Sequence, residues 1–84
     1  MTDQASSPMT AVVEVVARAL ADKPSAVSVQ ARERRGMTVV ELSMAPGDIG
    51  KVIGRQGRTA AALRTLVTLA AERAGTRATL DIRD

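Results

Sequence analysis

The chain has 84 residues, enough for one small domain, and its formal net charge at pH 7 is +3. Cysteine and histidine are absent, which excludes disulfides, thiolate metal sites and the commonest general base. Phe, Tyr and Trp are also absent, so the core must consist of Val, Leu, Ile, Met and Ala.

No apolar run approaches the roughly 20 residues of a membrane span. The N-terminus lacks a basic segment followed by an apolar one, so it does not resemble a secretory signal. We therefore expect a cytoplasmic protein without a membrane span.

Charge is distributed unevenly along the chain. Residues 1–48 hold five cations and six anions, whereas residues 49–84 hold seven cations and three anions. No acid lies between Asp48 and Glu72, a segment that contains Lys51, Arg55, Arg58 and Arg64. Such an imbalance creates a positive field that attracts polyanions, although a solvated helix face would show the same pattern.

The first predicted element is a helix that follows a polar segment. We expect residues 1–8 to be flexible, with Ser7 as the helix N-cap and Pro8 at the first helical position. Apolar residues then recur at helical spacing on one face: Met9, Val12, Val13, Val16, Ala17 and Leu20. Residues 22–24 end this helix, because proline disfavours helix in the residue before it.

Two strands follow in sequence. Alternation places Val27, Val29 and Ala31 on the inward face of the first strand. A polar turn ending in glycine is predicted over residues 32–36. The inward face of the second strand consists of Thr38, Val40, Leu42 and Met44. The short connection makes the pair an antiparallel hairpin.

Two helices and a final strand complete the pattern. The first helix restarts at Pro46, with Asp48 in its first turn to offset the exposed N–H groups, and ends at Gly54. The second begins near Arg58 and ends at Gly75. Their apolar stripes are Ile49, Val52 and Ile53, and Leu63, Leu66, Val67, Ala70 and Ala74. The last strand alternates Ala78, Leu80 and Ile82 with polar residues.

The element order α-β-β-α-α-β predicts an α+β fold, in which a three-stranded sheet has its helices packed on one face. The last strand reaches the sheet through two helices, so it can lie parallel to the second strand, as a crossover connection requires. This arrangement would bury every apolar stripe described above.

The turn Gly54-Arg55-Gln56-Gly57 carries a resemblance to a known family. A GxxG turn between the two helices of a β-α-α-β unit resembles KH domains, which clamp about four nucleotides with this loop. The additional helix and strand at the N-terminus resemble the type II KH order. Residues 40–67, VELSMAPGDIGKVIGRQGRTAAALRTLV, resemble the KhpA family of small bacterial KH proteins nearly throughout. Gly47 departs from the pattern, where a more helix-favouring residue such as Glu is expected.

The resemblance covers about residues 9–83 and implies a KH domain over residues 9–84. It implies a single-stranded RNA-binding protein of low sequence specificity, acting as an RNA chaperone in post-transcriptional regulation. The implied partners are a larger KH protein with a Jag domain (KhpB-like) and a second copy of the chain. The residues themselves suggest a pairing seam around the short helix and the GxxG turn, with Ile49 and Val52 partly exposed. The family is linked to cell-wall homeostasis, cell shape and cell elongation.

The residues themselves favour a phosphate site at this loop. Glycine lets a phosphate approach the main chain, and free N–H groups at the start of the following helix favour an anion. Arginines add charge-assisted contacts and a lysine adds a point charge. Bases could lie on a groove floored by Ile49, Val52, Ile53 and Leu63. The predicted RNA-binding residues are Ile49, Gly50, Lys51, Val52, Ile53, Gly54, Arg55, Gln56, Gly57 and Arg58.

Several of these residues also have a plainer structural interpretation. A GxxG sequence alone can be a simple turn between helices. Ile53 and Leu63 can belong to the core, and Gly50 can permit close helix packing instead of ligand approach. The hairpin arginines Arg32, Arg34 and Arg35 are interpreted as solvated charge.

Other functions remain as alternatives. One is a KH-fold module for protein interaction or dimerisation, and another is a helix-turn-helix DNA reader over residues 47–74, against which the three strand patterns argue. Glycines at 50, 54 and 57 fit neither GxxxxGK[ST] nor GxGxxG. No nucleophile has a suitable base, so no catalytic residue, metal or cofactor is expected and the chain is predicted not to be an enzyme.

Overall fold

The structure is a computed structural model that describes residues 7–83. The predicted flexible segment 1–8 lies outside the described residues, except for Ser7 and Pro8. Helix α1 (Pro8–Leu20) begins as predicted, because the Ser7 hydroxyl accepts a hydrogen bond from the Thr10 N–H at 3.3 Å. A one-turn 3-10 helix, η2 (Pro24–Ala26), connects α1 to the sheet.

Strands β1 (Ser28–Arg34) and β2 (Met37–Ser43) pair antiparallel, as predicted. The predicted turn over residues 32–36 is wrong in extent, because only Arg35 and Gly36 form it. Both have positive φ, 52° and 79°, and two-residue turns of this kind match the right-handed twist of the flanking strands. Pairing therefore continues to the turn on both sides.

The second half of the chain crosses from β2 to β3. A one-turn helix η3 (Pro46–Asp48) leads into α2 (Ile49–Ile53), and a second, η4 (Arg55–Gly57), leads into α3 (Arg58–Arg73). Strand β3 (Ala78–Arg83) pairs parallel to β2, and the sheet order is β1-β2-β3.

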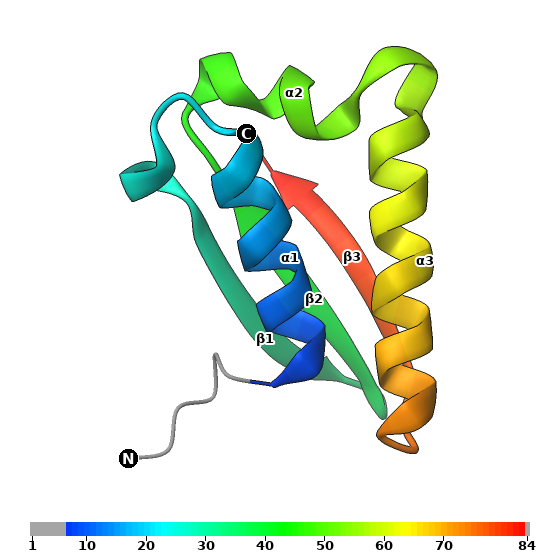
Figure 1. Cartoon of the computed structure of the whole chain (residues 1–84). Helices are drawn as coiled ribbons and strands as arrows, with labels where there is room; N and C mark the ends of the chain where they lie inside the picture. Colours follow the sequence, from blue (N-terminus) through cyan, green and yellow to red (C-terminus); the bar gives the residue numbers. More distant parts are fainter. Residues whose placement is uncertain (1–6, 84) are drawn as a thin grey trace.

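Figure 1 shows the helices on one side of the sheet, with α1 and α3 side by side and α2 crossing one end. The α+β prediction with helices on one face is confirmed. The helix-turn-helix alternative is wrong, because its first helix would be the five-residue α2 and a β-hairpin stands where such a domain needs a further core helix. No helix within residues 7–83 is long and apolar enough to cross a membrane.

The core lies between the helices and the inner face of the sheet. Its most deeply buried apolar side chains come from the helices and the sheet, and these are Val13, Ala17, Val40, Leu42, Val52, Leu63, Val67 and Ala71. At about 25 cal/mol per Å² of apolar surface removed from water, this burial is the main stabilising term. The alternation predicted for β2 is confirmed, since Thr38, Val40, Leu42 and Met44 are all buried.

Some predicted core positions are wrong. The buried side chains of α3 are Ala60, Leu63, Val67 and Ala71, a narrower stripe than predicted. Leu20, Ala31, Leu66 and Ala74 are exposed instead. In α3 only one row of side chains meets the sheet, so Leu66 falls on the flank of the helix. In β1, an edge strand, the short Ala31 side chain stays open to solvent.

The outer face of the sheet carries a cross-strand ion-pair network. Glu41 on β2 accepts from Arg32 on β1 at 3.1 Å and lies 3.7 Å from Arg83 on β3. Arg83 also contacts Asp81 at 3.0 Å. These acidic neighbours raise the pKa of Arg83, and the hydrogen bond that Arg83 donates to Asp81 contributes most strongly. Arg32 is thus an ion-paired side chain and not simply solvated charge.

Candidate nucleic-acid interface

The loop between α2 and α3 begins at a position that only glycine fits. Gly54 has φ 76° and donates its N–H to the Gly50 carbonyl at 2.9 Å, which ends α2 as predicted. A Cβ on Gly54 would lie 2.7 Å from Thr59 Cβ and 3.1 Å from the Thr59 nitrogen. Both the left-handed backbone and the contact with α3 therefore require glycine here.

The middle of the loop points its side chains into solvent. Arg55 and Gln56 are exposed, and Gln56 has an unusual positive φ of 59°. Gly57 follows at φ 73° and precedes α3, whose first turn receives no side-chain cap. Uncapped N–H groups at the start of a 16-residue helix favour an anion.

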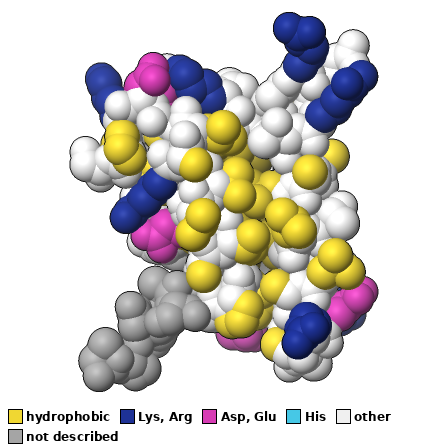
Figure 2. Space-filling model, in the orientation of Figure 1, with side chains coloured by type: hydrophobic (Ala, Val, Ile, Leu, Met, Phe, Trp, Pro, Cys, Tyr) yellow, Lys and Arg dark blue, Asp and Glu magenta, His cyan; other side chains and the backbone are white. Residues whose placement is uncertain are grey.

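The cations that follow the loop have no acid beside them. Arg55 and Arg64 make no ion pair with any residue from 7 to 83, and Arg58 donates only to the neutral Gln56 amide oxygen at 3.0 Å. Figure 2 shows dark-blue side chains projecting at the corner where α2 meets α3. These charges are available to a ligand.

Lys51 is placed differently from the arginines of the loop. Its Nζ lies 3.1 Å from Asp22 Oδ2 and 3.3 Å from Asp48 Oδ1. The hydrogen bond to Asp22, followed by that to Asp48, raises the pKa of Lys51. Its charge is compensated within the fold, an arrangement that the sequence analysis missed. The only signal in the sequence was the spacing of three between Asp48 and Lys51 on one helix face.

Asp48 stands in the first turn, as predicted, but its side chain makes no capping hydrogen bond to its own helix. Its side chain is 4% exposed and accepts from the Lys23 backbone N–H at 3.0 Å. That hydrogen bond is the largest cause of a lowered pKa of the Asp48 carboxyl, with Asp22 N–H and Lys51 also contributing. The carboxylate thus fastens the α1–β1 connection to the start of α2.

The predicted aliphatic groove is only partly present. Ile49 is half-buried and Ile53 is 40% exposed, so both present surface beside the loop. Val52 and Leu63 are 0% and 1% exposed and belong to the core, so as groove-floor residues they were predicted wrongly. Gly50 has nothing within 4 Å of an added Cβ. It does not serve close helix packing, and its face of α2 is open.

An apolar face between α1 and α3 was not predicted. Val15, Leu66 and Leu69 are 68%, 43% and 51% exposed, and Figure 2 shows hydrophobic side chains gathered over these two helices. Leu69 was left off the predicted stripe of α3, which was an available signal, whereas Leu66 was wrongly placed on that stripe. Within residues 7–83, no group of acidic side chains could hold a metal ion.

Comparison with known proteins identifies the family. Residues 10–82 match the model described as "KhpA/KhpB, KH domain". The RNA-binding protein KhpA of Halalkalibacterium halodurans is 47% identical over 90% of this chain and 100% of its own length. That of Treponema pallidum is 42% identical over 87% of this chain and 91% of its own. That of Caldanaerobacter subterraneus is 49% identical over 75% and 84%. The chain therefore belongs to the KhpA family of KH-domain proteins.

Proposed function

We propose that this protein binds single-stranded RNA at the loop from Gly54 to Gly57 and is not an enzyme. The observation that carries the proposal is an outward-pointing loop at the start of α3, followed by arginines without acidic partners. The relatives are themselves named RNA-binding proteins, which supports the same assignment.

In the proposed complex a phosphate approaches the main chain of the loop. The uncapped N–H groups at the start of α3 face it, and Arg55 and Arg58 supply charge-assisted contacts. The adjacent bases lie over the open face of α2, across Gly50, Ile49 and Ile53. Val52 supports this surface from the core, and Lys51 contributes less because Asp22 and Asp48 already hold its charge.

Binding by a single copy is weak and tolerant of sequence in this proposal. The chain has no aromatic residue, so it lacks stacking platforms that are each worth about 1–3 kcal/mol. Linking two such sites raises avidity by about 10²–10⁴-fold without new contacts. Pairing with a second KH protein would supply that gain.

We further propose the finer role that the family resemblance implies. The protein acts in the cytoplasm as an RNA chaperone in post-transcriptional regulation, together with a larger KH protein carrying a Jag domain, and contributes to cell-wall homeostasis and elongation. The domain spans residues 9–84. In support, one family model covers both KhpA and KhpB, which suits two related KH proteins in one process.

A second role, self-association, is favoured by the exposed apolar face of α1 and α3. Val15, Leu66 and Leu69 form this surface, whereas a seam through Val52 is excluded by its burial. Pairing through α1 and α3 would leave the loop free for RNA. Light scattering across concentration should show a dimer that Leu66→Glu with Leu69→Glu converts to a monomer. A wild-type monomer at all concentrations would contradict this role.

The RNA site is tested with the double variant Arg55→Asp/Gln56→Asp. Both side chains are exposed, so the fold should persist while two carboxylates repel phosphate. We expect binding to an unstructured RNA of about five nucleotides, just longer than the clamp of about four, to fall below detection in fluorescence anisotropy.

The matched control is Lys23→Asp/Ser25→Asp, which makes the same change in charge at exposed residues near η2. It should weaken RNA binding far less than the loop variant, because its new carboxylates lie near Asp48 at the start of α2 and not in the loop. Circular dichroism checks that both variants are folded. A folded loop variant with wild-type affinity would refute the proposed site.

A further inference from the structure

The arginines without acidic partners gather at both ends of α3, not only at the RNA loop. Among residues 7–83, Arg18, Arg32, Lys51 and Arg83 are ion-paired. The remaining arginines fall into two groups: Arg55, Arg58 and Arg64 near the start of α3, and Arg34, Arg35, Arg73 and Arg77 near its end. We call the second group the hairpin-end cluster.

The hairpin-end cluster is brought together by the fold, since its members come from separate elements. Arg34 and Arg35 stand at the β1–β2 turn, Arg73 ends α3 and Arg77 precedes β3. The Thr38 N–H donates to the Arg77 carbonyl at 2.9 Å, which fastens the hairpin to the start of β3. Glu33 and Glu72 lie in the same region, and Glu33 accepts from the Thr38 hydroxyl. Four cations against two anions leave this end positive.

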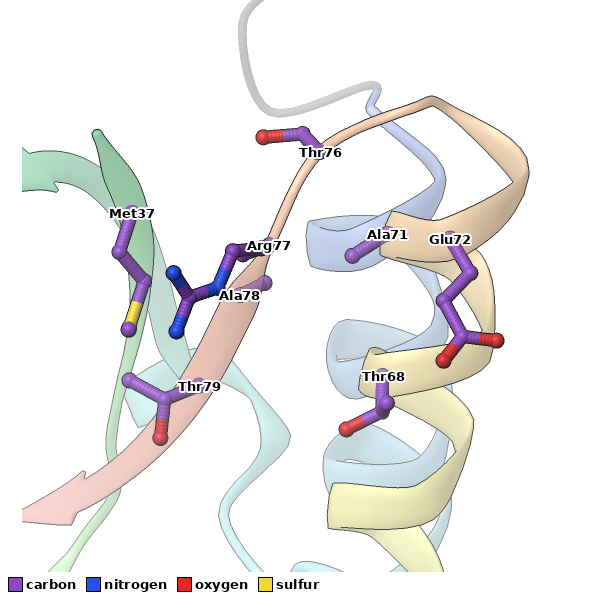
Figure 3. A pocket seen from close by; sticks show the side chains of 8 residues that line it. All are labelled: Met37, Thr68, Ala71, Glu72, Thr76, Arg77, Ala78 and Thr79. Carbon is purple, nitrogen blue, oxygen red and sulfur yellow. The ribbon is translucent and has the colours of Figure 1, made fainter.

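An open hollow of about 380 Å³ lies beside this cluster. Figure 3 shows it between the end of α3 and the start of β3, with Met37 of β2 beyond. Its walls are Met37, Thr68, Ala71, Glu72, Thr76, Arg77, Ala78 and Thr79. Threonine hydroxyls and a guanidinium suit phosphate and ribose oxygens, a thioether suits the face of a base, and a carboxylate can accept from an exocyclic amino group.

One flank of α3 joins the RNA loop to this hollow. Ala61, Thr65, Thr68 and Glu72 recur at helical spacing along it, and no acid precedes Glu72. The other flank carries Leu66 and Leu69 and belongs to the apolar face described above. The helix has 16 residues, so its ends lie roughly 24 Å apart. A base-stacked strand, which rises about 3.4 Å per nucleotide along its axis, spans that distance in about seven nucleotides.

We propose that an RNA strand held at the loop runs along this flank and is held a second time at the hairpin end. The hollow receives a nucleotide, and the hairpin-end cluster contacts the neighbouring phosphates. This inference rests on the proposed RNA function and extends it. RNA affinity then depends on strand length, because RNA of about five nucleotides reaches only the loop whereas RNA of about 16 nucleotides reaches both sites.

The test compares these two RNA lengths on Arg35→Gln/Arg77→Gln, with Arg34→Gln/Arg73→Gln as a second, independent variant. Removing two phosphate contacts should weaken binding of the longer RNA by on the order of tenfold and make the log–log salt slope shallower by about 1.4, since each contact contributes about 0.7. Binding of the shorter RNA should be unchanged. Arg18→Gln/Lys23→Gln removes the same charge elsewhere and should change neither.

Each outcome separates this inference from the proposed function. If both hairpin-end variants bind the longer RNA like the wild type, the second site is refuted while the loop can still bind RNA. The second site is also refuted if these variants weaken the binding of both RNA lengths equally, or if they lose only the binding of a protein partner. If Arg55→Asp/Gln56→Asp leaves the shorter RNA bound, the proposed function itself fails.

Discussion

The two ends of α2 use similar residues for different purposes. Lys51 and Arg55 are four residues apart, yet Lys51 is held by Asp22 and Asp48, whereas Arg55 has no acidic partner in the described chain. Gly50 and Gly54 differ in the opposite sense, because Gly50 has open space beside it whereas Gly54 is pressed against Thr59. Of the two cations, Lys51 is therefore fastened to the fold and Arg55 is left for a ligand.

The largest expected effect is a difference in stability between alanine variants of the two loop glycines. Gly54→Ala forces a side chain into the left-handed region and against Thr59, and should cost about 2 kcal/mol or more of unfolding free energy. Gly57→Ala meets nothing within 4 Å and should cost only about 1 kcal/mol, from its positive φ. Urea denaturation measures both. Equal losses in the two variants would show that the contact with Thr59 does not matter.

A second test concerns the fastening at Asp48. Its pKa is lowered below the ordinary 3.8 in the folded chain, so the unfolded chain takes up this proton first as pH falls. The stabilisation is present above the unfolded pKa and is lost as pH falls through the folded pKa. The pKa of Lys51 is raised above the ordinary 10.5 in the folded chain. Lys51 therefore stabilises the fold at pH values below its unfolded pKa, and this stabilisation is lost as pH rises through its folded pKa.

Asp48→Asn should therefore lower the unfolding free energy at pH 7. The unfolding free energy of this variant should also fall less steeply than that of the wild type as pH is lowered from 7 to 3. The amide keeps an oxygen for the Lys23 N–H but lacks the charge that holds Lys51. Urea titrations at several pH values measure this difference. An Asn variant with the pH profile of the wild type would show that Asp48 is not the titrating group.

The smallest expected change in stability comes from Gly50→Ala. Alanine at an unstrained, open helical position should raise the unfolding free energy by about 0.5–1 kcal/mol. If RNA bases lie across this face, the added methyl group should nevertheless weaken RNA binding several-fold in anisotropy. A stabilised variant with unchanged affinity would remove Gly50 from the site.

Much of the fold could be predicted from the sequence because local signals agreed with the tertiary structure. Ser7 and Pro8 marked the start of α1, and alternation in β2 marked its buried face. At the end of α3, Gly75 has φ 76° and its N–H donates to the Glu72 carbonyl at 3.1 Å, as expected of a C-terminal glycine.

The errors came from contacts between distant parts of the chain. Periodicity could not show that α3 buries only one row, which leaves Leu66 exposed, or that Val52 faces the core instead of a groove. The pairing of Lys51 with Asp22 joins residues 29 positions apart, and no local pattern contains it. Sequence therefore located the loop but could not tell which nearby charges the fold had already compensated.

The most direct test of this account is the salt dependence of RNA binding by the wild type, Lys51→Gln and Arg58→Gln. A clamp on about four nucleotides neutralises few phosphates, so with a short RNA the wild-type log–log slope should be shallower than about −4. Arg58→Gln should make it shallower still by about 0.7, the contribution of one phosphate on a single strand. Lys51→Gln should leave the slope nearly unchanged. A Lys51 effect as large as that of Arg58, or a wild-type slope steeper than about −4, would contradict the division between fastened and free charges.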